Sequence, residues 1–169
     1  MQPFFRSSSR WQVSRLCSAA SFAPVAISLH CEQILSAMAA LDSTKLVRLV
    51  TRFISDRNVL PDPAEATGTT KGPSSHVQLL ALNVIASAVK SLSSSALLLE
   101  LPLLIPLILP AFRSEWIDVR KAVVFVLVEV YLVVGDALHE YLQVLSPPQR
   151  KLVTIYIDKQ MGQREILVL

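Results

Sequence analysis

The residues able to carry catalysis or to bind a metal are scattered along the chain. The histidines are His30, His76 and His139, and the cysteines are Cys17 and Cys31. None of them stands in a His-x-x-x-His or Cys-x-x-Cys setting, which would place two ligands on one side of a metal. The chain has no Gly-x-Ser-x-Gly nucleophile elbow, and the Gly-Thr-Thr-Lys-Gly run at 68–72 lacks the spacing of a phosphate-binding loop. We therefore expect a protein that is not an enzyme and needs no cofactor or metal.

A polar turn followed by a long apolar helix is the more informative feature. The turn covers residues 114–117, and Asp118 is well suited to cap the helix by accepting a backbone N–H bond. The first turn of the helix carries a basic pair, Arg120 and Lys121. The helix is expected to stop at Gly135, because glycine readily takes the left-handed conformation that ends helices.

The composition favours an all-α protein without a nucleic-acid surface. Hydrophobic residues make up 52% of the chain, there are only four glycines, and no Asn-Gly or Asp-Gly hairpin dipeptide occurs. The net charge of +3 comes from three arginines in residues 1–31, where there is no acidic residue, so the remainder is neutral. This distribution argues against nucleic acid as a partner. Two cysteines form no disulfide framework and suggest a reducing compartment.

The N-terminal part of the chain divides into a leader and a helix. Residues 1–23 are rich in Ser and Arg and free of acidic residues, which is typical of a disordered leader or of an organellar transit peptide. The apolar spacing over 24–41 predicts a helix. The domain is therefore expected to cover residues 24–169.

A break at 42–43 precedes the next predicted helix. Its apolar face comprises Leu46, Val47, Leu49, Val50, Phe53 and Ile54. Its other side carries a basic stripe of Lys45, Arg48 and Arg52, which we interpret as a solvated face. Residues 56–75 contain three prolines and two glycines, so they are expected to form a flexible loop or a binding loop.

Two further segments follow with a break at 93–95. Residues 76–92 predict an amphipathic helix. Residues 96–112 contain Pro102, Pro106 and Pro110, each of which removes a backbone donor, so this segment is not expected to form one straight helix. We expect a short lead and then a helix that restarts at 103–106.

The C-terminal part predicts a short helix over 137–145 and a last helix over 149–163 that starts at Ser146-Pro147-Pro148. In the last helix, Leu152, Ile155 and Tyr156 are expected on the buried face. In the long helix, Val124, Leu127, Val128 and Tyr131 share one side and are expected to pack against 103–113 and 149–161.

The apolar runs 96–112 and 122–134 raise the alternative of a membrane hairpin. The first run contains Glu100 and three prolines, and the second contains Glu129 and is too short to span a bilayer. A buried helix pair explains both runs, so a membrane partner is not expected.

The chain resembles the C-terminal HEAT-repeat domain of the CLIP-associating proteins, the CLASP family, in its plant-like form. The residues that carry the resemblance are Ala-Phe at 111–112, DVRKAVVFVLVEVYLVVG at 118–135 and YLQVLSPPQRKLVTIY at 141–156. It is specific over about 100–165, and over 24–99 only the helical rhythm agrees. The resemblance implies antiparallel helical hairpins stacked as a partial HEAT-repeat, TOG-like array.

The resemblance also implies a microtubule-associated module that binds tubulin or a microtubule-linked adaptor protein and contributes to microtubule stabilisation. It implies a location in the cytoplasm, on the cytoskeleton and spindle. In TOG-type arrays the turns of the hairpins form the edge that holds tubulin, and the matching turn here contains Glu115, Trp116, Arg120 and Lys121. Two roles stay open for Arg120, Lys121 and Trp116. Arg120 either meets an acidic partner or pairs with Asp118 or an acidic residue of a neighbouring repeat. Lys121 likewise either meets an acidic partner or braces the stack. Trp116 either anchors an interface or packs over the end of its own hairpin.

Two alternatives remain beside this interpretation. One is a small membrane-associated protein with a proline-broken apolar hairpin, and the other is a helical protein imported into an organelle by residues 1–23.

Overall fold

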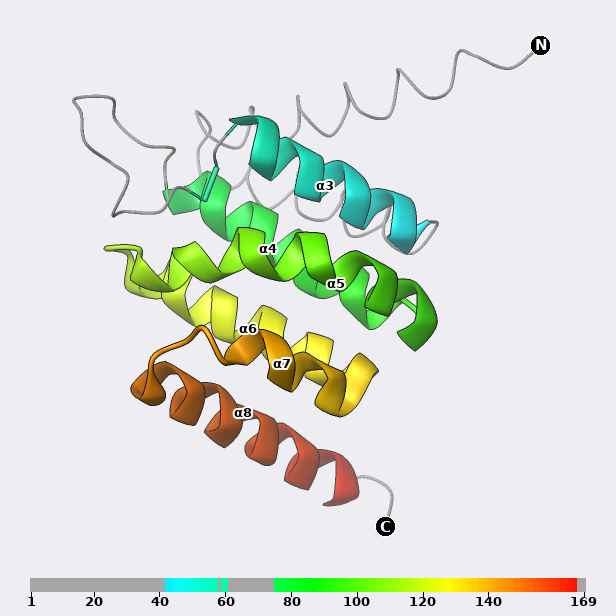
Figure 1. The fold of residues 1–169 in the computed structure, drawn as a ribbon, viewed down its shortest axis with the longest axis vertical. Helices are drawn as coiled ribbons and strands as arrows, with labels where there is room; N and C mark the ends of the chain where they lie inside the picture. The colour runs from blue at the N-terminus through cyan, green and yellow to red at the C-terminus, as the bar shows by residue number, and fades with distance from the viewer. Residues whose placement is uncertain (1–41, 58, 61–74, 167–169) are drawn as a thin grey trace.

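The computed structural model describes residues 42–57, 59–60 and 75–166 (Figure 1). The predicted leader at 1–23 and the predicted helix at 24–41 lie outside these residues. The described elements, in chain order, are α3 (Ser43–Arg57), α4 (Ser75–Lys90), α5 (Ser94–Ile108), the 3-10 segment η1 (Leu109–Arg113), α6 (Ile117–Val134), the 3-10 segment η2 (Gly135–Leu138), α7 (His139–Leu142) and α8 (Pro147–Ile166). This part of the chain contains no strand, which confirms the predicted all-α class.

The helices form two layers around one apolar core. Helix α3 contacts α4 and α5, α4 packs most extensively on α6, and α6 also contacts α5 and α8. Figure 1 shows α3, α5 and α7 running in one direction, while α4, α6 and α8 run in the opposite direction behind or below them. Consecutive helices therefore form antiparallel pairs, and α6 lies in the middle of the core.

Short polar residues begin three of the helices where the sequence predicts breaks. The Asp42 carboxylate accepts the Lys45 backbone N–H at 3.0 Å at the start of α3. The Ser93 hydroxyl accepts the Ala96 N–H at 3.3 Å at the start of α5. Before α8, the Gln149 side-chain oxygen accepts the Ser146 backbone N–H at 3.0 Å, as in a capping box. Each bond satisfies a donor that the first helical turn would otherwise leave unpaired.

The start of α6 differs from the sequence prediction. Trp116, and not Asp118, occupies the capping position, and its side chain makes no capping hydrogen bond. Asp118 lies inside the first turn, where its charge interacts favourably with the helix dipole. The physical reason is that the Arg120 side chain, from within the first turns of α6, donates to the carbonyls of the preceding turn, so that the helix begins two residues earlier than predicted.

The end of α6 follows the prediction. Gly135 has a φ of 62°, in the region that favours glycine, and its N–H donates to the Tyr131 carbonyl. The Tyr131 hydroxyl donates to the Asp136 carboxylate at 3.2 Å, just beyond the helix end. This hydrogen bond is the main cause that raises the pKa of Tyr131, with smaller contributions from burial and from the negative charges of Asp136 and Asp158.

We expect the substitution Asp136→Asn to lower the pKa of Tyr131 toward the ordinary value for tyrosine. The carboxylate favours the neutral phenol in the folded protein, so the stabilisation it provides is present below the unfolded pKa of about 10 and is lost as the pH rises through the folded pKa. An ultraviolet titration checks this, with Tyr131→Phe subtracted to isolate the signal of this residue. An unchanged titration curve in Asp136→Asn would contradict the assignment.

Helix α5 corrects the prediction for residues 96–112. It is a continuous α-helix from Ser94 to Ile108 with Pro102 and Pro106 inside it. The missing N–H groups would have donated to the carbonyls of Leu98 and Pro102, one turn earlier. Both of these residues are exposed, so water can satisfy the two carbonyls. The helix therefore continues through both prolines, and only its end, at Pro110, tightens into the 3-10 segment η1.

The boundaries of the predicted 56–75 loop are also corrected. Helix α3 extends to Arg57, and Val59 and Leu60 are 2% and 5% exposed in the core. The Val59 N–H donates to the Ile54 carbonyl at 3.0 Å, which ties the end of α3 to the following residues. Two apolar side chains here are sufficient to hold the start of this segment on the core. Residues 61–74 lie outside the described part of the chain.

The buried face of α8 differs from the predicted one. Val153 and Ile157 are buried, Tyr156 is half-buried, and Leu152 and Ile155 are exposed at 43% and 52%. The sequence contains two apolar stripes on this helix, and contact with α6 selects the one at 153 and 157. In α6 itself, the predicted burial of Val124, Leu127 and Val128 is confirmed, and Tyr131 is half-buried.

Two helical stretches of the described residues are long and apolar enough to cross a membrane by length and composition alone. They are Ser94–Arg113 and Ile117–Leu142, and 44% of each apolar window is buried inside the fold. The second stretch is longer than the 122–134 run suggested, because η2 and α7 continue the helical path beyond Gly135. Core helices of globular proteins meet the same criterion, so this finding does not by itself favour a membrane location.

Candidate functional site

The turn before α6 is braced by Arg120. Its guanidinium donates to the Ser114 carbonyl at 2.5 Å and to the Glu115 carbonyl at 3.1 Å. The Ser114 hydroxyl accepts the Trp116 backbone N–H at 3.3 Å. Of the two roles considered for Arg120, this is the bracing one, but its partners are the carbonyls of the turn and not Asp118 or an acidic residue of another repeat.

The two residues best placed for a partner lie on either side of this braced turn. Trp116 is 49% exposed, so about half of the residue is covered by the protein and about half is accessible to solvent. The Lys121 ammonium lies 3.7 Å from the Asp118 carboxylate, and both side chains are mostly exposed. Such an exposed pair is weak and is screened by salt, so Lys121 remains available to an acidic partner. Glu115 is exposed on the same turn.

A groove opens beside this turn, between the N-terminal halves of α6 and α8. It encloses a cavity of about 460 Å³. Its lining is mainly apolar and consists of Phe112, Ile117, Val124, Phe125, Pro148, Leu152 and Tyr156, together with the polar Arg120, Lys121 and Gln149. Phe125 and Tyr156 meet edge to face with their ring centres 5.8 Å apart. The groove therefore combines aromatic and basic side chains, a composition suited to binding an apolar side chain that carries nearby negative charge.

The helix directions add to the positive character of the groove. Figure 1 shows α6 and α8 running in the same direction, so their N-terminal ends lie on the same edge of the protein. A helix N-terminus carries a partial positive charge from its unpaired N–H groups. Both ends therefore reinforce Lys121, while Asp118 in the first turn of α6 offsets part of this charge.

The structure brings two of the four predicted site residues into the groove. Arg120 and Lys121 line it, while Glu115 and Trp116 stand on the turn that leads into it. The groove residues Phe112, Phe125, Leu152 and Tyr156 were not predicted as site residues. A signal was present in α6, because Ile117, Lys121, Val124 and Phe125 recur at spacings of three and four and so share one face. That face mixes a lysine with large apolar residues, which a core face rarely does.

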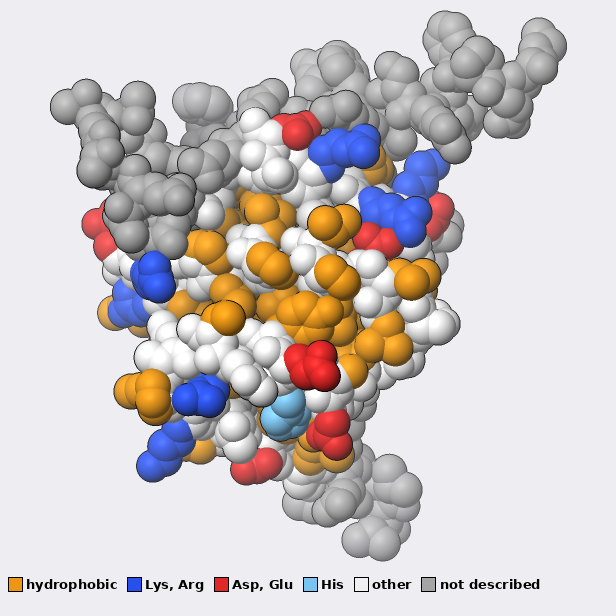
Figure 2. Space-filling model, viewed as in Figure 1, with side chains coloured by type: hydrophobic (Ala, Val, Ile, Leu, Met, Phe, Trp, Pro, Cys, Tyr) orange, Lys and Arg blue, Asp and Glu red, His pale blue; other side chains and the backbone are white. Residues whose placement is uncertain are grey.

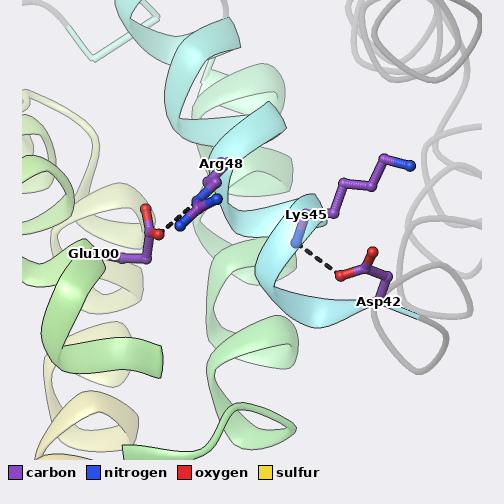
Figure 3. Close-up of polar contacts among 4 residues, drawn as sticks. All are labelled: Asp42, Lys45, Arg48 and Glu100. Atoms are coloured by element: carbon purple, nitrogen blue, oxygen red, sulfur yellow. Dashed lines mark hydrogen bonds and ion pairs between the residues drawn. The ribbon is translucent and has the colours of Figure 1, made fainter. Parts of the chain in front are cut away.

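The basic stripe predicted on α3 is only partly a solvated face. Figure 3 shows Arg48 reaching Glu100 of α5, with 2.6 Å between Arg48 Nε and Glu100 Oε1. Glu100 is buried, with 8% of its side chain exposed, whereas Arg48 remains 63% exposed. Lys45 and Arg52 are exposed as expected. The ion pair joins α3 to α5 and is a structural contact.

The described residues contain no group of three His, Cys, Asp or Glu side chains that could hold a metal ion. Asp136 and His139 approach each other with 3.8 Å between Oδ1 and Nδ1. Lys90 and Glu129 form an ion pair at 3.2 Å between α4 and α6. These contacts link elements of the fold, and none of them converges on the groove.

Comparison with known proteins shows that about half of the chain is similar to CLIP-associating proteins. The chain is 40% identical over 78 residues to a CLIP-associated protein of Arabidopsis thaliana, a match that covers 46% of this chain and 5% of the relative. It is 35% identical over 83 residues to CLIP-associating protein 1-A of Xenopus laevis, covering 49% of this chain and 6% of the relative. CLIP-associating protein 1 of Xenopus tropicalis is 34% identical over the same length.

The predicted family resemblance is thus confirmed for about half of the chain. No family model matches the chain. The matched segment spans only 5–6% of the length of these relatives.

Proposed function

We propose that this chain, homologous to CLIP-associating proteins over about half its length, is a non-catalytic interaction module. It would bind tubulin or a microtubule-linked adaptor protein and contribute to microtubule stabilisation in the cytoplasm. The observation that carries the proposal is the groove between α6 and α8, which is lined by aromatic side chains and by Lys121. The family of the relatives supplies the class of partner.

The arrangement of the helices supports this proposal. Antiparallel helix pairs follow one another in two layers, as in a HEAT-repeat or TOG-like array. In such arrays the turns on one edge carry the binding residues, and the turn at 114–116 lies on the same edge as the start of α8. We propose that this edge, with Trp116, Lys121 and the adjoining groove, is the docking surface. Arg120 would fix the conformation of the turn at 114–116 through its two hydrogen bonds to the backbone carbonyls of that turn.

Two different physical terms would contribute to binding at this edge. Lys121 would attract an acidic surface, and this contribution would fall as salt is added. Trp116 and the groove would bury apolar area, a contribution that depends little on salt. The two terms can therefore be separated by measuring binding at several ionic strengths.

Microtubule co-sedimentation of the full chain tests the proposal. We expect Trp116→Ala to weaken binding by about tenfold or more, as for an exposed aromatic anchor. We expect Lys121→Glu to weaken it by about threefold or more, with a larger effect at low salt. Circular dichroism of both variants checks that the helices are retained.

Lys159→Glu is the matched control, because Lys159 is an exposed lysine in the C-terminal half of α8 that does not line the groove. It makes the same change in net charge and should leave binding close to that of the unmodified chain. The docking surface would be refuted if Trp116→Ala and Lys121→Glu both stay folded and both bind as tightly as the control.

A further inference from the structure

Gln149 belongs both to the start of α8 and to the lining of the groove between α6 and α8. Its side-chain oxygen accepts the Ser146 backbone N–H at 3.0 Å and the Ser146 hydroxyl at 2.9 Å. The same residue lines the groove together with Arg120 and Lys121. It is the third residue of α8, so the helix fixes its backbone. One side chain therefore links the capping of α8 to the proposed docking surface.

The two bonds from Ser146 fix the orientation of the Gln149 amide. A backbone N–H can only donate, so the atom that it contacts must be the amide oxygen. A carbonyl oxygen has two lone pairs, and the two Ser146 donors occupy both. The amide nitrogen lies at the other end of the same planar group, and within the described residues it makes no hydrogen bond. Gln149 thus offers a ligand a held donor and no free acceptor.

The charged side chains of the groove are donors as well. Arg120 and Lys121 carry N–H groups and positive charge and have no acceptor atom. Among the described residues that line the groove there is no Asp or Glu, and the Tyr156 hydroxyl is able both to donate and to accept. Figure 2 shows Lys and Arg side chains at the edge where α8 begins, whereas the Asp and Glu side chains seen over α7 and α8 lie away from that edge. The groove is therefore complementary to a ligand with acceptor atoms and negative charge.

We propose that Gln149 is a specificity-determining residue, which selects partner segments that carry a carboxylate next to an aromatic or large apolar side chain. The apolar side chain packs against Phe125 and Tyr156, whose rings meet edge to face. The carboxylate accepts a hydrogen bond from the Gln149 amide and is attracted by Lys121. Ser146 is a positioning residue, because it keeps the amide oxygen engaged and so prevents it from repelling the carboxylate. The inference rests on the proposed docking surface and adds the chemical class of the segment that it binds.

Glutamate at position 149 separates the capping role from the ligand role. Gln149→Glu keeps the side-chain oxygen that accepts from Ser146, and Glu serves as well as Gln at this position of a capping box. Its negative charge also suits the first turn of a helix. In place of the amide donor, however, it presents a second negative oxygen, which repels a carboxylate. The variant should therefore retain α8 and lose the selective contact.

Fluorescence anisotropy of the full chain with two synthetic peptides tests the inference. One peptide places a phenylalanine among glutamates, and the other has glutamine instead of each glutamate. We expect the unmodified chain to bind the acidic peptide at least about tenfold more tightly than the amide peptide. We expect Gln149→Glu to reduce this ratio at least about fivefold. Thermal denaturation should show that the variant melts no lower than the unmodified chain, because the cap is retained.

Gln163→Glu is the matched control, since Gln163 is exposed near the other end of α8 and does not line the groove. It makes the same chemical change and should keep the preference of the unmodified chain to within about twofold. Ser146→Ala removes the hydroxyl bond and leaves the backbone N–H bond, so the preference should fall by about twofold or more. This variant decides the question if Gln149→Glu does not fold.

The inference is overturned if the unmodified chain binds both peptides equally or binds neither. It is also overturned if a folded Gln149→Glu variant keeps the preference for the acidic peptide, which would leave Gln149 with the capping role alone. These outcomes are separate from the microtubule experiment. A chain that prefers the acidic peptide through Gln149 but does not co-sediment with microtubules would support the inference and refute the proposed partner. Co-sedimentation without any preference between the peptides would have the opposite meaning.

Discussion

Leu127→Ala is expected to lower the free energy of unfolding by about 2–5 kcal/mol, the range for a leucine removed from a well-packed core. Leu127 is fully buried in α6, the helix that contacts α4, α5 and α8. Truncation at this point leaves a cavity bordered by several helices, and these cannot all move inward to fill it. Urea denaturation followed by circular dichroism measures the loss.

The same substitution at an exposed leucine provides the control. Leu99 is 74% exposed, so Leu99→Ala should change the free energy of unfolding by no more than about 0.5 kcal/mol. A loss well below 1 kcal/mol for Leu127→Ala would mean that α6 is not the centre of the core. Equal losses for the two variants would contradict the two-layer arrangement.

Arg48→Met is expected to lower the free energy of unfolding by about 1–3 kcal/mol, because it leaves the Glu100 carboxylate with no cation beside it. Glu100 has 8% of its side chain exposed on an otherwise apolar helix, and Arg48 Nε lies 2.6 Å from it (Figure 3). The attraction itself is screened, since Arg48 is 63% exposed. The loss therefore reflects mainly the cost of a buried acceptor without its partner.

A second change distinguishes this cost from a simple loss of packing. In the double variant Arg48→Met with Glu100→Leu, no buried charge remains, and stability should return to within about 1 kcal/mol of the unmodified chain or exceed it. Arg52→Met is the matched control one turn further along α3, where the arginine is exposed and should cost at most about 0.5 kcal/mol. A double variant that is less stable than Arg48→Met alone would rule out this explanation.

Several helix boundaries could be predicted from the sequence alone. Asp42, Ser93 and the Ser146 and Gln149 pair begin helices where the sequence indicated breaks, and Gly135 ends α6 at a positive φ. These helix ends could be predicted because each capping interaction joins residues within one turn of each other. Such an interaction depends on the local sequence and not on tertiary packing. The all-α class follows from the same local evidence.

Tertiary contacts decided the properties that local sequence left open. Helix α5 continues through Pro102 and Pro106 because the residues whose carbonyls lose a donor are exposed, so water can satisfy them. Contact with α6 selects Val153 and Ile157 as the buried face of α8 over the equally apolar Leu152 and Ile155. Which of the two stripes is buried depends on the helix that packs against it. The sequence of α8 alone does not indicate which face that helix contacts.

The candidate site shows the same division between sequence and structure. The region with Trp116, Arg120 and Lys121 was recognisable because polar residues gather within 114–121, directly before a long apolar run. The groove beside it was not, because its two walls come from α6 and α8, which the turn at Gly135 and the start at Ser146 separate in the chain. The Arg48 and Glu100 pair is separated by 52 residues and was equally hidden. Local sequence determines how each helix begins and ends, whereas the pairing of distant side chains and the walls of a groove exist only once the helices are packed, because burial depends on all neighbours together.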